Sequence, residues 1–137
     1  MCIRDSHWKF DEGSGTTAFN NVAGGTDGTI VSATWVNDPI RSVVLSFDGI
    51  DDVVNMIGYK GITGGASRSM CLWFKTDGSG GTGSSGRGLL GWGIPTTAGA
   101  RWELTVNTMG DPRVPGALRI NTATGTRTCQ TVVTDST

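Results

Sequence analysis

Five of the twelve acidic residues cluster in two places, Asp11–Glu12 and the turn Asp48–Asp52. Calcium takes six to eight oxygen ligands at about 2.3–2.6 Å, and acidic loops supply them from carboxylates and main-chain carbonyls. If calcium binds, we expect Glu12, Asp48 and Asp51 to provide the carboxylates. The alternative is that Asp48 and Asp51 are turn formers whose side chains accept bonds from nearby backbone N–H groups. Calcium is therefore a candidate cofactor, and both interpretations stay open.

Two aromatic residues could present a ring face to a sugar. Trp92 lies between two glycines just before Ile94-Pro95, and Tyr59 follows Gly58. Neither lies in an alternating pattern that predicts burial, so we expect Trp92 and Tyr59 to be the ligand-binding residues. The alternative is that both rings cap the ends of a core with their polar edges in water.

Catalytic chemistry lacks its usual residues. A retaining glycosidase needs two carboxylates about 5–5.5 Å apart, but Glu12 and Glu103 are the only glutamates, and His7 is the only histidine. The glycine pattern 78–83 resembles a dinucleotide fingerprint, yet no helix pattern follows it to receive a pyrophosphate. We therefore expect no enzyme.

Charge and hydropathy limit the partners. With 11 basic and 12 acidic residues the net charge is −1, so the basic patch of a nucleic-acid-binding protein is not expected. No apolar run approaches the roughly 20 residues of a membrane-spanning helix. The three cysteines, Cys2, Cys71 and Cys129, leave open either a Cys71–Cys129 disulfide or inert thiols.

Composition and periodicity predict an all-β fold. Glycine supplies 22 of 137 residues, and each glycine in a helix interior costs about 1 kcal/mol relative to alanine. Period-two alternation and turn residues predict short strands of the kind that build a sandwich. The strands are expected at 7–12, 29–36, 42–48, 53–57, 69–75, 101–107, 117–121 and 129–133. We expect 42–48 and 53–57 to form a tight pair, 69–75 to be a central strand covered on both sides, and 78–88 to be a mobile loop.

Alternation also predicts which side chains form the core. In 101–107, Trp102 and its apolar neighbours should point inward, and the polar side chains should point outward. The expected core aromatics are Trp8, Phe47, Trp73 and Trp102, and the expected outward side chains are Arg101, Glu103, Thr105 and Asn107.

Four motifs in order carry a resemblance to a known family: WKFDEGSG at 8–15, DG at 27–28, LSFDGIDD at 45–52 and LWFK at 72–75. Together they resemble the laminin G-like branch of the concanavalin A-like lectin/glucanase superfamily, while residues 76–137 match only as strands of the expected kind. The resemblance implies a two-sheet antiparallel jelly roll. It also implies a non-catalytic binding or adhesion module of a secreted or cell-surface protein, often bacterial, that recognises glycans or cell-surface proteins and sometimes holds calcium.

Two other functions stay open, a structural spacer without ligand and an accessory module of a glycoside hydrolase or lyase whose catalytic domain lies elsewhere. Residues 1–6 resemble translated sequencing-adapter text, and we expect them to be non-native, with the domain spanning 7–137. The family continues with further strands, so we expect C-terminal strands to be missing and the isolated chain to be poorly soluble.

Overall fold

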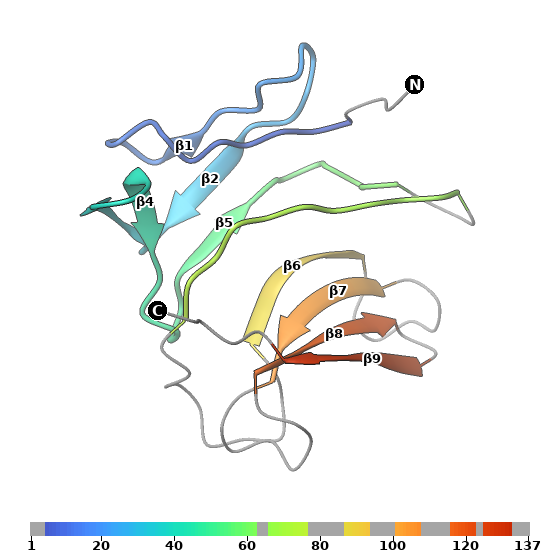
Figure 1. The fold of residues 1–137 in the computed structure, drawn as a ribbon. Coiled ribbons are helices and arrows are strands. Elements are labelled where there is room, and N and C mark those ends of the chain that lie inside the picture. The colour runs from blue at the N-terminus through green and yellow to red at the C-terminus, as the bar shows by residue number, and fades with distance from the viewer. Residues whose placement is uncertain are drawn as a thin grey trace. The chain divides into compact units, whose positions relative to one another are not determined.

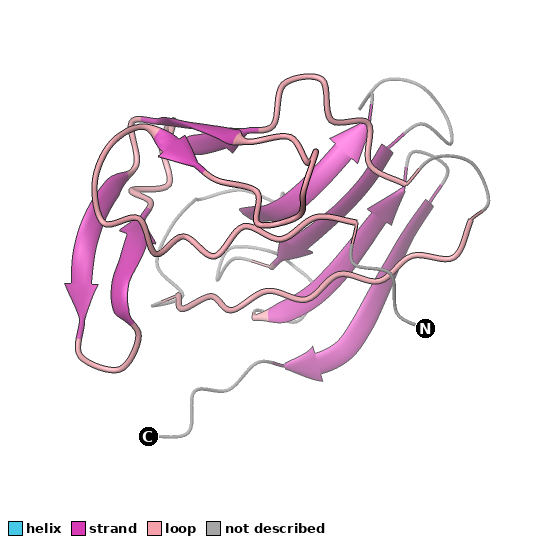
Figure 2. Cartoon of the chain, turned by 90° about the horizontal axis from the view of Figure 1, so that it is seen from above, coloured by secondary structure: helices cyan, strands magenta, loops and turns pink. Residues whose placement is uncertain are grey.

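The computed structural model describes residues 5–62, 66–76, 87–93, 101–107, 116–122 and 125–132. All regular secondary structure in these ranges is β-strand, and the sheets are antiparallel (Figure 2). The prediction of an all-β fold is confirmed. The chain divides into two compact units, Met1–Tyr59 and Lys60–Thr137, which are described in turn.

The first unit contains short strands arranged in two small sheets. Strands β1, β2 and β5 form one antiparallel sheet in the order β1-β2-β5, and β3 pairs with β4 (Figure 1). The strand bounds are Thr17–Ala18 for β1, Gly28–Val31 for β2, Thr34–Asp38 for β3, Ser42–Ser46 for β4 and Val53–Asn55 for β5.

A backbone reversal divides the predicted strand 29–36 into β2 and β3. Ser32 adopts a φ of 63°, and the Ala33 N–H donates to the Val31 carbonyl at 2.8 Å. This left-handed conformation cannot continue an extended strand. The chain therefore leaves the first sheet after Val31 and starts a second pairing at Thr34.

The predicted pairing of 42–48 with 53–57 is wrong. Leu45 of β4 pairs with Trp35 of β3, whereas Val54 of β5 pairs with Ile30 of β2. The Asp38 carboxylate accepts bonds from two backbone N–H groups of the following turn, at 2.9 and 2.8 Å. These bonds stabilise the short turn between β3 and β4, and the two strands therefore pair as a hairpin.

The predicted strand 7–12 is also wrong. Its one ladder contact is an isolated bridge between Trp8 and Asn20. Phe10 has a φ of 58°, which interrupts the extended backbone in the middle of the segment. Trp8 is half-buried. In this segment, the alternation of apolar and polar residues therefore does not correspond to a strand.

The buried interior of the first unit lies around β2. Ala18 and Ile30 are buried, and a Cβ built on Gly28 would lie 2.7 Å from Cγ1 of Val54. Phe47 was expected in this core, but it is 51% exposed. It follows the last residue of β4 and starts the acidic turn, so no sheet neighbour covers it in the described part of the unit.

The second unit contains a four-stranded antiparallel sheet in the order β6-β7-β8-β9 (Figure 1). Its strands are Arg87–Gly93 for β6, Arg101–Val106 for β7, Ala117–Thr122 for β8 and Gly125–Val132 for β9. The predicted strands 101–107 and 117–121 are confirmed, and the last predicted strand begins earlier, at Gly125.

Strand β6 was not predicted. Its glycines leave few side chains to alternate, and an irregularity between Gly88 and Leu90 shifts the register against β7. The strand includes Arg87 and Gly88, which were expected in a mobile loop; residues 78–86 of that loop lie outside the described residues.

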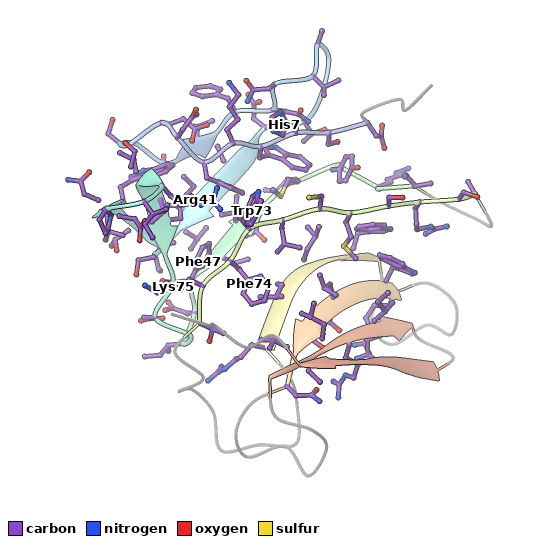
Figure 3. All side chains as sticks on the ribbon, viewed as in Figure 1. His7, Arg41, Phe47, Trp73, Phe74 and Lys75 are labelled. Atoms are coloured by element: carbon purple, nitrogen blue, oxygen red, sulfur yellow. The ribbon has the colours of Figure 1, made fainter. Side chains whose placement is uncertain are left out.

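The segment 69–75 is extended but belongs to none of the strands, so its prediction as a central strand is wrong. Its alternation is confirmed, because Met70, Leu72 and Phe74 are half-buried while Cys71 and Trp73 are exposed. Trp73 and Phe74 project to opposite sides of the segment (Figure 3). Trp73 is 80% exposed, so its prediction as a core residue is also wrong.

The polar side of β7 differs from the expected outward face. Thr105 and Asn107 are 2% and 3% exposed, and Arg119 of β8 is 6% exposed. Thr105 pairs with Arg119 in the ladder, and its hydroxyl donates to the Arg119 carbonyl at 3.4 Å. Residues on both faces of this part of the sheet are buried. The alternation of apolar and polar residues predicts burial of only one face, so it could not predict this.

Candidate functional site

The acidic turn brings three carboxylates together. Ligand oxygens of Asp48, Asp51 and Asp52 lie within 4.8 Å of one another. Asp52 completes this group in place of the predicted Glu12, whose Oε1 accepts a bond from the Phe19 N–H at 2.8 Å. The closeness of the three aspartates follows from their short spacing in the sequence.

Hydrogen bonds show what these carboxylates do within the fold. Asp48 Oδ1 accepts from the Ile50 N–H at 2.8 Å, and Asp52 Oδ2 accepts from the Asp48 N–H at 2.7 Å. Asp51 Oδ2 accepts from the Ser32 hydroxyl at 3.3 Å. The oxygen chemistry suits a hard cation, but one ligand oxygen from each of the three carboxylates falls short of the six to eight oxygens that calcium takes. Asp48 and Asp52 stabilise the turn through its backbone N–H groups, whereas Asp51 connects the turn to Ser32, and calcium stays a prediction.

Tyr59 lies at an aromatic and polar junction in the first unit. Its ring meets Trp8 edge to face, with centroids 5.6 Å apart and planes at 83°. Its hydroxyl donates to Asp5 Oδ2 at 3.3 Å, and the Trp8 indole N–H donates to the Thr26 carbonyl at 3.0 Å. Tyr59 is thus half-buried, with its position set by a neighbouring ring and a carboxylate.

A hollow of about 290 Å³ opens beside this ring. Its lining combines an aromatic ring, a carboxylate, a hydroxyl and a glycine-containing turn. The lining residues are Asp5, Ser6, Val22, Ala23, Gly24, Gly25, Thr26 and Tyr59. The hydroxyl oxygen of Ser6 is buried and has no hydrogen-bond partner.

Asn20 shapes the turn that forms one wall of this hollow. Its Oδ1 accepts from the His7 N–H at 3.1 Å and from the Val22 N–H at 3.0 Å. Its Nδ2 donates to the Thr26 carbonyl at 3.3 Å. One side chain therefore connects the N-terminal segment with both ends of the turn, a role that sequence analysis did not assign to it.

Trp92 lies in the second unit, within β6. Its ring stacks on that of its cross-strand neighbour Trp102, with centroids 5.3 Å apart and planes at 27°. A Cβ built on Gly61 would lie 2.8 Å from three atoms of the Trp92 ring. Trp92 is half-buried between such neighbours, and its role in ligand binding stays a prediction.

Glu103 is the one glutamate of the second unit. Its Oε2 lies 3.8 Å from the Arg101 Nε and accepts a bond from the Asn121 amide at 3.4 Å. This carboxylate is therefore part of a polar network across β7 and β8.

No helix in the described part of the chain has the length and apolar character needed to cross a membrane. Comparison of the chain with models of protein families, with curated proteins and with solved structures found no match.

Proposed function

We propose that the chain is a non-catalytic binding module that recognises glycans, and that the hollow beside Tyr59 is its binding site. The proposal includes a two-sheet jelly-roll domain within a secreted or cell-surface protein, as the four sequence motifs imply. The observation that carries the proposal is the position of Tyr59 in a polar hollow of the first unit.

The lining matches the chemistry of a sugar. A pyranose offers an apolar face to an aromatic ring and hydroxyl groups at its rim. Asp5 accepts a bond from the Tyr59 hydroxyl on one oxygen, and its other oxygen can accept a bond from a sugar hydroxyl, because an ionised carboxylate has two acceptor oxygens. The Ser6 hydroxyl and the backbone of Ala23 and Gly24 add donors and acceptors, whereas the Val22 N–H and the Thr26 carbonyl bond to other groups of the unit. At about 290 Å³, the hollow lies near the lower end of small-molecule sites, about 300–1,000 Å³, so we expect it to take a single terminal sugar.

A glycan array followed by calorimetry on the best ligand tests the proposal. We expect Tyr59→Ala to abolish binding, and Tyr59→Phe to retain part of it because the ring remains. Phe19→Ala is the matched control, since Phe19 is an exposed aromatic residue of the same unit and does not line the hollow. Absence of glycan binding would contradict the proposal and favour a structural spacer. Equal binding by Tyr59→Ala would contradict the assignment of the site to the hollow beside Tyr59.

Asp5 and Ser6 belong to the segment predicted to be non-native, so a chain that begins at His7 provides a second test. We expect it to bind the same glycan more weakly, with the remaining affinity still dependent on Tyr59. Binding that becomes independent of Tyr59 would place the site elsewhere.

Calcium binding at the acidic turn is a separate part of the proposal. Titration with calcium should raise the melting temperature of the chain, and Asp48→Asn should remove the rise. An unchanged melting temperature on adding calcium or EGTA would leave the three aspartates with only the hydrogen bonds they make within the fold.

A further inference from the structure

The first unit contains the pairs Asp27-Gly28 and Asp48-Gly49, and the structure holds them in different settings. An aspartate can react with the backbone nitrogen of the residue that follows it. Glycine has no side chain to hinder this reaction, so an aspartate before a glycine reacts most readily. A third such pair, at 77–78, lies outside the described residues. The two described pairs therefore place the same chemistry in two structural environments.

At Asp48 the side chain folds back over its own backbone. Its Oδ1 accepts from the Ile50 N–H at 2.8 Å, the bond that an aspartate makes to the second residue after it in a turn. The ring closed by this bond contains the Asp48 carboxyl carbon and the Gly49 nitrogen, so the carboxyl group stays beside the peptide it can react with. All three residues are exposed and lie between β4 and β5, outside the strands.

At Asp27 the carboxylate bonds to a different segment, because its Oδ1 accepts from the Asn20 N–H at 2.8 Å. Gly28 is buried at the start of β2 and pairs with Ala18. A Cβ built on Gly28 would lie 2.7 Å from Cγ1 of Val54, which leaves little room for this backbone to rotate. Reaction here requires β2 to open, whereas an exposed turn opens at a lower cost in free energy.

We propose that Asp48 is a site of spontaneous isoaspartate formation and that the fold protects Asp27 from the same reaction. The Gly49 nitrogen loses its proton and forms a bond to Cγ of the protonated Asp48 carboxyl group, from which one oxygen leaves as water. The product is a cyclic imide. Water then opens the ring: cleavage of the new N–Cγ bond restores aspartate, and cleavage of the original peptide bond gives isoaspartate. Water is the only other reactant.

This modification would change the acidic turn. Isoaspartate adds a methylene group to the main chain and carries its carboxylate on a shorter branch, so the bond to the Ile50 N–H is lost. The Asp48 N–H donates to Asp52 Oδ2, so the change reaches a second carboxylate of the turn. The inference is independent of the glycan site, because no residue of this turn lines the hollow beside Tyr59.

The test compares the two sites within one molecule. The folded chain is incubated in water enriched in the heavy oxygen isotope and digested with trypsin, which separates the two aspartates by cleavage after Arg41. Mass spectrometry with electron-transfer fragmentation then distinguishes isoaspartate from aspartate. We expect isoaspartate at Asp48 to exceed that at Asp27 about tenfold or more, a difference of about 1.4 kcal/mol in activation free energy. In urea that unfolds the chain, both sites should convert at similar rates.

Two variants locate the reaction. Asp48→Glu should remove the signal, because a glutamate must close a larger ring, and Asp27→Glu should leave conversion at Asp48 unchanged. Three outcomes would overturn the proposal. Equal conversion at both sites of the folded chain would show that β2 gives no protection. Absence of isoaspartate at Asp48 in the folded chain would show that the turn is not reactive. A signal that persists in Asp48→Glu would place the reaction at another aspartate of the same peptide.

Discussion

Gly61→Ala should destabilise the second unit by two separate effects. Gly61 has a φ of 63°, and an alanine in this left-handed region costs about 1–2 kcal/mol. The new Cβ would also lie 2.8 Å from three atoms of the Trp92 ring. Forcing extra volume into a packed site costs about 1–3 kcal/mol, so the expected total loss in unfolding free energy is about 2–5 kcal/mol.

Gly58→Ala separates the two effects. Gly58 has a φ of 87°, and a Cβ added there would meet no atom within 4 Å, so this variant carries backbone strain without a clash. Urea unfolding followed by Trp fluorescence measures both variants. We expect Gly61→Ala to lose about 1–3 kcal/mol more than Gly58→Ala, together with a change in near-ultraviolet circular dichroism from displacement of the Trp92–Trp102 stack.

The comparison can refute the reasoning directly. If Gly61→Ala is destabilised no more than Gly58→Ala, the Gly61 backbone does not pack against the Trp92 ring. In that case Trp92 would have a more accessible ring face than the structure gives it, and its predicted role in ligand binding would gain support.

Three further substitutions test other contacts by urea unfolding. Asn20→Ala should cost about 2–4 kcal/mol, because the backbone N–H groups of His7 and Val22 lose their acceptor. Asn21→Ala is the control, and an equal loss there would contradict the assigned role of Asn20. Gly28→Ala should cost about 1–3 kcal/mol through the clash with Val54, and a double-mutant cycle with Val54→Ala should show coupling; additive losses would argue against that contact. Ser32→Gly should gain or hold stability, since it relieves a left-handed φ that costs other residues about 1–2 kcal/mol; a clear loss would mean that the hydroxyl bond to the acidic turn outweighs the strain.

Sequence alone predicted the class of fold and the strands at 101–107 and 117–121, whereas the alternation at 7–12 and 69–75 does not correspond to strands. The strands at 101–107 and 117–121 were identifiable because neighbours two residues apart carry the signal locally. β6 was missed because its glycines remove that signal. The proximity of Asp48, Asp51 and Asp52 was also within reach of sequence analysis, since all three lie in one turn.

Only the tertiary structure decided which strands pair and which apolar side chains are covered. β4 pairs with β3 instead of β5, and Phe47 and Trp73 are exposed, because burial depends on segments distant in the sequence. The hollow beside Tyr59 has the same origin, since it needs Ser6 and the turn Val22–Thr26 at the same place as a ring more than thirty residues away in the sequence. Alternation is a property of consecutive residues, whereas a pairing partner or a pocket is a property of the whole folded chain.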